Sequence, residues 1–462
     1  MIKKIFFLLL LFTSAFAEES FLSANKVYFK NDRLKLQDSF TLKYPSFSIS
    51  ATEADVEKLS LKELSQFSSL HLKNHIDFQS DLFGRITADE AFIDNEKSYI
   101  EFQSQDHILF NSKLIKVPLQ AKAKKASLFF KNNIDIQKFK ESQLDSIHLN
   151  EEVCLEYDSK YQAYGHTANY TIEKNRNNIF QLLPKENERC LLKYENDLLT
   201  ASEILFNTEL ALIQMQKPQG KICYNNTPIE FEATNLIYDD LKQYFSLTKE
   251  ASIKTPLGKL SSDAIEIFQK RFMNQKVLKK IILRGTNHFE GTQDHDFKIE
   301  CEGLIDIDHE KKMLTASSFL RENEKKPIIY EDAQMKLFAE EGYLTYSMVD
   351  NKTQVQQITM NKNIKIILHS EKGNTGYGIA DKITYSPQKK SMILHSFPDN
   401  KVLFWQDDHG LKLSANEIEI SFNQGEKKPE IKGIGKVRFS FDLSEEQLLH
   451  NIFSKYLEMQ YE

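Results

Sequence analysis

A short pattern of small, polar and apolar positions returns along most of the chain. Each copy has a small residue, two intervening residues, an apolar residue, one more residue and a second apolar residue, as in Ala380-x-x-Ile383-x-Tyr385. The copies begin at Ala24, Ala51, Ala88, Ala123, Ala201, Ala233, Ser262, Ala380 and Ala415. Side chains alternate between the two faces of a strand, so the last two positions of each copy share one face. The pattern predicts one strand unit repeated in stacked layers around a continuous core.

Alternating apolar runs also fill the chain between these copies. Met392 and Leu394 form one such run, and Val402 and Phe404 form the next. Polar turn sequences such as Ser386-Pro387-Gln388 separate the runs, whereas helix-period patterns are scarce before residue 440. We therefore predict an all-β fold.

The first residues have the three parts of a secretory signal. Lys3 and Lys4 precede an apolar run over residues 5–12, and Ala15-Phe16-Ala17 supplies small residues for cleavage. We predict a cleavable signal peptide over residues 1–17 and an exported protein. The alternative is an uncleaved membrane anchor, but the run is shorter than the roughly 20 residues of a comfortable span.

The net charge limits the possible partners, and the chain length limits the possible architectures. The formal net charge is −6, and loss of Lys3 and Lys4 with the signal would make it about −8. Such a chain has no basic field to attract nucleic acid, so no nucleic-acid partner is expected. About 445 residues would remain, more than one compact core usually holds, and the repeat favours an elongated array over separate globular domains.

The four cysteines lie in the middle of the chain. They are Cys154, Cys190, Cys223 and Cys301. Their even number in an exported chain predicts disulfides, with three connectivities that the sequence does not distinguish; buried thiols are the alternative. A metal site is disfavoured because no C-x-x-C or Cys/His cluster has ligand spacing.

The C-terminus changes from strand to helix patterning. Ser444-Glu445-Glu446-Gln447 has the spacing of a capping box. An apolar stripe follows at Leu448, Leu449, Ile452, Phe453, Tyr456 and Leu457. We predict a short amphipathic helix over residues 442–462 that covers the open strand edge near residues 437–441. A docking helix for a partner or a membrane surface is the alternative.

No constellation of catalytic residues stands out. His71 and His75 share one face of a predicted strand, where surface histidines are the simpler interpretation. Asp407-Asp408-His409-Gly410 falls where a hairpin turn is needed. The chain has no G-x-S-x-G, P-loop or H-E-x-x-H motif. We predict no catalytic residue, no metal and no cofactor, and hence no enzyme.

What remains is a long inward apolar face. The candidate lining residues are Val27, Phe29, Phe40, Leu42, Ile204, Phe206, Leu236, Tyr238, Ile383, Tyr385, Val402, Phe404, Leu411, Leu413, Ile418 and Ile420. They could pack against each other as a dry core. They could instead line a groove for acyl chains if two sheets splay apart.

The last part of the chain resembles a known family. Residues 377–385, 392–394, 401–404, 411–420 and 432–437 are similar to the organic-solvent-tolerance (OstA-like) domain of periplasmic lipopolysaccharide-transport proteins, and residues 230–268 and 24–56 resemble it more loosely. The resemblance implies an elongated β-jelly-roll, taco-shaped in section, whose apolar interior carries lipid A acyl chains. The chain differs in being longer than the single-domain bridge proteins, in its four cysteines and in its terminal helix.

The resemblance leads to a predicted organisation and function. Residues 18–145, 146–285 and 286–441 would be three OstA-like β blocks between the signal peptide and the helix. The chain would be a non-catalytic lipopolysaccharide-binding bridge in the periplasm, associated with the outer or inner membrane. Its end strands would pair with other transport proteins or with copies of itself, and the strand over residues 25–30 is the expected docking edge. The alternatives are a structural or adhesive β-solenoid with a packed core and, less favoured, an enzyme on a β-helix.

Overall fold

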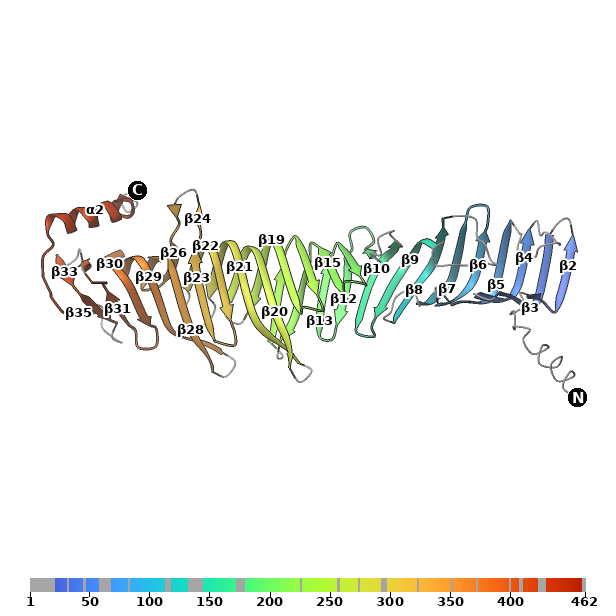
Figure 1. The fold of residues 1–462 in the computed structure, drawn as a ribbon, viewed down its shortest axis with the longest axis horizontal. Helices are drawn as coiled ribbons and strands as arrows, with labels where there is room; N and C mark the ends of the chain where they lie inside the picture. Colours follow the sequence, from blue (N-terminus) through green and yellow to red (C-terminus); the bar gives the residue numbers. More distant parts are fainter. Residues whose placement is uncertain are drawn as a thin grey trace, which may run out of the picture. The chain divides into compact units, whose positions relative to one another are not determined.

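The architecture is nearly all β. The computed structural model describes residues 21–30, 33–44, 47–57, 68–81, 84–112, 118–131, 144–171, 179–224, 227–255, 258–272, 275–291, 297–321, 324–349, 352–370, 373–398, 400–406, 410–422 and 429–458 (Figure 1). Within this part, strands pair antiparallel and one helix follows them, which confirms the all-β prediction.

The chain divides into two compact units at residues 218 and 219. The predicted block boundaries after residues 145 and 285 fall elsewhere, inside the strands β9 (Leu144–Tyr157) and β21 (Gln275–Gly291). Both strands have a ladder on each side, so the sheet continues through these positions.

The first unit is a meander of long strands. Its strands are β1 (Phe21–Ser23), β2 (Lys26–Lys30), β3 (Arg33–Tyr44), β4 (Phe47–Glu57), β5 (Ser69–Ser80), β6 (Gly84–Asp94), β7 (Tyr99–Ser112), β8 (Leu119–Phe130), β9, β10 (Tyr161–Thr171), β11 (Ile179–Leu183), β12 (Cys190–Tyr194), β13 (Asp197–Ala201), β14 (Glu203–Asn207) and β15 (Leu212–Gln216). From β3 to β10 each strand pairs with the next one along the chain. Nearly all of these ladders shift register once, close to the middle of the strand.

These shifts mark a corner at which each strand leaves one sheet and enters another. We call the sheet that contains residues 53–57 and 69–73 sheet A, and the sheet that contains residues 47–50 and 76–80 sheet B. Every strand from β3 to β10 contributes one half to each sheet. The inward residues of both halves are buried, as shown by Leu36 and Phe40 at 0% exposure, so the core lies between the two sheets.

The repeated sequence pattern is the signature of this corner. In strands that run from sheet B to sheet A, the small residue ends the first half, the next two residues make the bulge, and the two apolar residues face the core. Ala88 and Ala123 are 7% and 1% exposed at the inside of two such corners. A larger side chain there would meet the opposite sheet, which explains the small residue.

Strands that run the other way turn the corner differently. Asp38 and Ser39 have φ values of 59° and 78°, and Asn74 and His75 have 62° and 55°. Pairs of residues in the left-handed region also occur at Glu151 and Glu152. Asn, Asp and His tolerate this region better than most residues do, although each such residue costs some stability.

The second unit uses the same corner. Its strands are β16 (Gln219–Tyr224), β17 (Thr227–Glu232), β18 (Asn235–Asp239), β19 (Tyr244–Thr255), β20 (Gly258–Phe272), β21, β22 (Phe297–Asp308), β23 (Met313–Ser318), β24 (Leu320–Arg321), β25 (Glu324–Lys325), β26 (Ile328–Asp332), β27 (Met335–Ala339), β28 (Glu341–Val349), β29 (Lys352–Ser370), β30 (Gly373–Ser386), β31 (Ser391–His395), β32 (Val402–Gln406), β33 (Leu411–Ala415), β34 (Glu417–Ser421) and β35 (Glu430–Ile434). The pair β24 and β25 forms a small separate hairpin. Sheets A and B of this unit contain residues 244–248 and 251–255 of β19, respectively.

The C-terminal helix α2 (Leu443–Glu458) forms as predicted but begins with a different capping box. Asp442 Oδ1 accepts from the Glu445 N–H at 2.9 Å, and the Asp442 N–H donates to the Glu445 carboxylate at 2.8 Å. Asp442 is therefore the N-cap, two residues before the predicted Ser444. The cap lowers the pKa of Asp442, through the Ser444 hydroxyl and then the Glu445 N–H.

The helix packs on a sheet face and also contacts the predicted edge segment, where Phe441 joins the same apolar cluster and Arg438 binds Glu445. Leu449 and Phe453 are 4% and 0% exposed and pack on outward side chains of sheet B. These side chains are Phe338, Ile367, Tyr377 and Leu403, with Trp405 beside them. The outward face is apolar here, so it offers the helix more burial than the narrow strand edge does. The predicted stripe is narrower in the structure, because Leu448 is 49% exposed; the side chains of Tyr456 and Leu457 lie outside the described residues.

Candidate functional site: an apolar interior and a polar corner

Most of the predicted lining residues lie between sheets A and B. Thirteen of them are 8% exposed or less. These are Phe40, Leu42, Ile204, Phe206, Leu236, Tyr238, Ile383, Tyr385, Val402, Phe404, Leu413, Ile418 and Ile420. Leu411, at the start of β33, is half-buried. The interior at these positions is packed side chain against side chain.

Val27 and Phe29 differ from that prediction, since they are 58% and 56% exposed. Their positions opposite Leu36 and Leu34 put them on the inward face of sheet A. They are open to solvent because β2 is the edge strand of sheet A and, in the described part of the chain, pairs with β3 alone. Tyr28, on the outward face, is 56% exposed as well.

A continuous row of apolar side chains runs across sheet A from this edge strand. Val27 is opposite Leu36, which is opposite Ala54, and the same cross-strand row continues strand by strand across sheet A. Its further members are Leu72, Ala91, Phe102, Ala126, Leu149, Ala168, Leu182 and Ile204. Large side chains alternate with alanines, and all except Val27 are 3% exposed or less. We call this row the apolar file.

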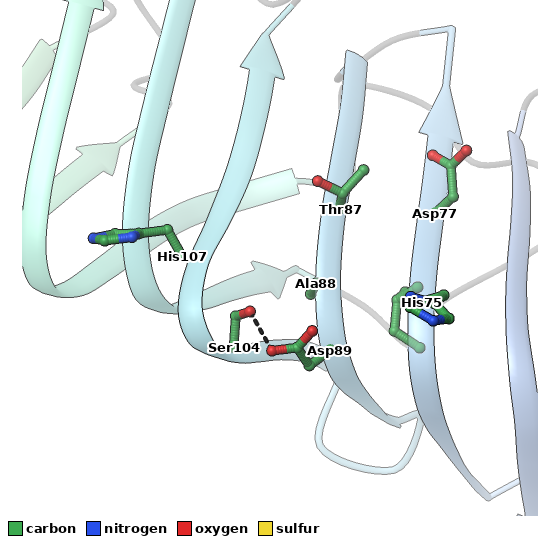
Figure 2. Close-up of a pocket in the computed structure, with 8 residues that line it drawn as sticks. His75, Asp77, Thr87, Ala88, Asp89, Ser104 and His107 are labelled. Carbon is green, nitrogen blue, oxygen red and sulfur yellow. Dashed lines mark hydrogen bonds between the residues drawn. The ribbon is translucent and has the colours of Figure 1, made fainter.

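The corner of the first unit holds a polar pocket of about 330 Å³ (Figure 2). His75 and Asp89 come from neighbouring strands, and Ser104 and His107 come from the bulge of β7. Figure 2 shows the Ser104 hydroxyl reaching the Asp89 carboxylate, a hydrogen bond of 2.6 Å. Sequence analysis did not select Asp89 or Ser104; the only signal is that Asp89 follows the corner residue Ala88.

The polar groups of this pocket are held by bonds within the corner. Asp89 also accepts from the Gln105 N–H at 2.9 Å, and these two hydrogen bonds lower its pKa. Asp77 is bound by Arg85 through contacts of 2.8 and 3.0 Å. Burial raises the pKa of Asp77, but the hydrogen bonds of Arg85 and Gln79 outweigh it, so the net pKa lies below the usual value. These interactions therefore stabilise the strand corner that forms the pocket.

The imidazoles at and near the corner have different surroundings. His107 lies 3.3 Å from Asp106 and 3.4 Å from Glu152, and Glu152 also binds Lys124 at 2.8 Å. His71 and His75, which sequence analysis placed on one strand face, are separated by the corner: His71 is on sheet A beside Glu90, and His75 is in the bulge. Among the residues that the structure describes, no group of three or more His, Cys, Asp or Glu side chains could hold a metal ion.

The four cysteines are thiols, which corrects the disulfide prediction. Cys154 faces outward on β9 opposite Tyr164 of β10, and Tyr164 is opposite Leu191 of β12. Cys190 therefore lies two strands away, on the other face, and about 10 Å separates such strands, beyond the reach of a disulfide. Burial raises the pKa of Cys190 to about 12 and that of Cys301 to about 11.

Tyr346 and His309 form a polar pair in the second unit, with the tyrosine buried and the histidine half-buried. The Tyr346 hydroxyl lies 3.1 Å from His309 Nδ1, and His309 Nε2 has no hydrogen-bond partner in the described part of the chain. Burial lowers the pKa of His309 to about 4, so the ring is neutral near pH 7.

Comparisons with known proteins add little. No family model and no curated protein matches the chain. Among solved structures it has a similarity to the crystal structure of TcdB2-TccC3-TEV, with 7% identity and a TM-score of 0.08. The match covers 92% of this chain and 28% of that one. A TM-score of this size supports no argument about fold or function. Within the described residues, no helix is long and apolar enough to cross a membrane.

Proposed function

We propose that the protein is a non-catalytic lipid-binding bridge of the lipopolysaccharide-transport type, with a jelly-roll cross-section formed by sheets A and B. The observation that carries this proposal is the apolar file, which runs in register from the exposed Val27 to the buried Ile204. An acyl chain gains about 0.8 kcal/mol for each buried CH₂. Successive positions of similar apolar character would let a chain move without a deep trap.

The connectivity of the first unit supports a groove that opens. From β3 to β10 the backbone passes between sheets A and B only at the corner. At the strand ends away from the corner, each connection joins two strands of the same sheet. Sheet separation at those ends would break side-chain packing but no ladder hydrogen bond. The alanines of the apolar file are the positions where least packing would be lost.

The exposed strand β2 supports association at this edge. Within the described residues one side of β2 has no strand beside it, and this free side and the apolar side chains Val27, Tyr28 and Phe29 are features of a strand that receives another one. Lys26, which pairs with Asp38 at 2.6 Å, is one of two lysines at the ends of β2 and gives little protection against pairing. The partner would be a neighbouring transport protein or a second copy of this chain.

A photo-crosslinking experiment tests the lipid proposal. Benzoylphenylalanine at the inward Phe40 or Phe404, both 0% exposed, should capture lipopolysaccharide in cells, whereas the same probe at the outward Thr41 or Glu419 should not. Equal labelling of inward and outward positions would contradict a groove between the sheets.

A packed structural solenoid is the second candidate. The observation that favours it is the near-complete burial of the interior residues, since a groove in use would show side chains open to solvent. Absence of labelling at both Phe40 and Phe404 in a stable protein would favour this candidate.

A further inference from the structure

The outward face of sheet A in the first unit carries a ladder of aromatic rings. His71, Phe92, Tyr99, Phe129 and His148 come from the five consecutive strands β5 to β9, and we call them the aromatic ladder. Successive ring centroids are 6.2, 6.1, 6.2 and 5.0 Å apart. The rings alternate with inward core residues along their strands, so they point away from the apolar file.

The ladder is open to solvent in part. Phe129 is 37% exposed, and the His71 side chain is 38% exposed. Cross-strand aromatic pairs stabilise a sheet by a fraction of a kcal/mol to about 1 kcal/mol each. Isolated pairs already provide this stabilisation, so it does not require a ring on each of five successive strands. The continuity of the ladder is therefore the feature that needs a further explanation.

The rings belong to two cross-strand rows that they share with polar side chains. The first row is Asp55, His71, Phe92, Glu101, Ser127, His148 and Asn169. The second row is Glu57, Ser69, Asp94, Tyr99, Phe129, Ser146 and Thr171. From β4 to β10 these rows contain rings, hydroxyls, an amide and carboxylates, and no lysine or arginine.

On β3 the two rows continue with Lys35 opposite Asp55 and Arg33 opposite Glu57, and Arg33 lies 2.6 Å from Glu57. From β4 to β10 the cations of this surface lie outside the two rows. Lys73 and Lys125 belong to the next row toward the corner, where Lys125 lies 3.4 Å from Glu151. Lys97, in the turn before Tyr99, lies 3.1 Å from Asp94. Phosphate-bearing partners such as nucleic acids and anionic lipids bind through lysine and arginine. The two rows therefore have the wrong charge for such partners.

We propose that the aromatic ladder binds an extended, uncharged polysaccharide. The C–H faces of sugar rings pack against aromatic side chains, and sugar hydroxyls donate to carboxylates and exchange hydrogen bonds with hydroxyls and amides. Glu101, Ser127 and Asn169 are partly exposed and supply these groups, whereas Asp94 and Ser146 are buried. The rows cross six strands from β5 to β10, about 24 Å at the usual strand spacing, which suits a chain of several sugars. This binding surface is on the outside of sheet A and does not depend on the proposed lipid groove.

Affinity electrophoresis of the purified protein tests the proposal. Native gels would contain hydroxyethyl cellulose or glycol chitin as uncharged polysaccharides and dextran sulfate as an anionic one. We expect retardation by at least one of the uncharged polymers, and at least tenfold weaker apparent binding for the double variant Tyr99→Ala/Phe129→Ala. The control is Tyr244→Ala/Phe268→Ala, a ring pair of the second unit with centroids 5.1 Å apart, which lies beside Glu266 and Arg284 and should bind as the wild type does.

Single charge changes keep the test decisive if the double variant does not fold. Ser127→Lys and Glu101→Lys alter outward side chains within the first row and should weaken retardation by the uncharged polymers. Absence of retardation by both uncharged polymers would overturn the proposal. So would retardation by dextran sulfate alone, tighter binding of the lysine variants, or equal loss in the control pair. Loss of crosslinking to lipid with intact glycan binding would reject the groove and leave the ladder standing.

Discussion

Removal of the Phe453 side chain should release helix α2 from sheet B. Phe453 is fully buried and packs edge-on against Tyr377 at 5.3 Å and Trp405 at 5.0 Å between ring centroids. Truncation of a buried phenylalanine to alanine costs about 3 to 5 kcal/mol. The ion pair of Lys412 with Glu446 is exposed and adds less than about 1 kcal/mol. Since about 1.4 kcal/mol is a factor of ten, a loss of about 3 kcal/mol raises the fraction of molecules with an undocked helix roughly a hundredfold.

Trp405 provides a direct readout, because it is the only tryptophan of the chain. In Phe453→Ala, its emission should shift to longer wavelength and its quenching by acrylamide should increase. The far-ultraviolet signal of the sheets and the main thermal transition should change little, because the helix lies on an outward face. Leu448→Ala, at a position 49% exposed on the same helix, is the matched control and should behave as the wild type does.

Two results would refute this reasoning. Unchanged Trp405 quenching in Phe453→Ala would mean that the helix is held by contacts other than this aromatic cluster. A large fall in the main thermal transition would mean that α2 belongs to the cooperative core of the second unit and is not a separate covering element.

Three further predictions concern the corner, the thiols and His309. Ala123→Leu should lower the free energy of unfolding by about 1 to 3 kcal/mol in urea titrations through overpacking at the inside of the corner, whereas Gln120→Leu on the outward face should change it little. Cys190 and Cys301 should resist alkylation in the folded protein at pH 8, because their raised pKa values keep them neutral; four thiols should react after denaturation without reductant, and fewer would restore the disulfide prediction. The depressed pKa of His309 means that the unfolded state binds more protons between about pH 6.5 and 4, so stability should fall as pH falls through this window, by at most roughly 3 kcal/mol, and less steeply in His309→Phe.

The strands and the inward positions could be predicted because period-two alternation depends on local sequence alone. Phe404 and Ile418 are buried on the face that the pattern assigns them. The same pattern could not reveal that Val27 and Phe29 are exposed, since burial also requires a covering neighbour. The position of β2 at the edge of sheet A is a property of the topology.

The corner, the ladder and the helix position were not predictable for a different reason. The small residue at Ala88 was recognised, but its role depends on two sheets meeting there. The rings of Tyr99 and Phe129 are far apart in sequence and meet only through the register of β7 and β8. The apolar stripe of the helix predicted that Phe453 is buried but not the surface on which it packs. Tyr377 and Leu403 belong to an outward face, which alternation alone marks as solvent-facing.

The two kinds of corner limit how a chain of this design can grow or shrink. A strand entering sheet A needs a small inner residue, and a strand leaving it needs residues that tolerate positive φ, as at Asn74 and His75. Loss of one strand would place each later corner sequence on a strand of the wrong direction, whereas loss of a hairpin such as β4 with β5 would preserve every later one. Length variation among chains with this corner should therefore occur in whole hairpins, each changing the extent of the first unit by about 10 Å.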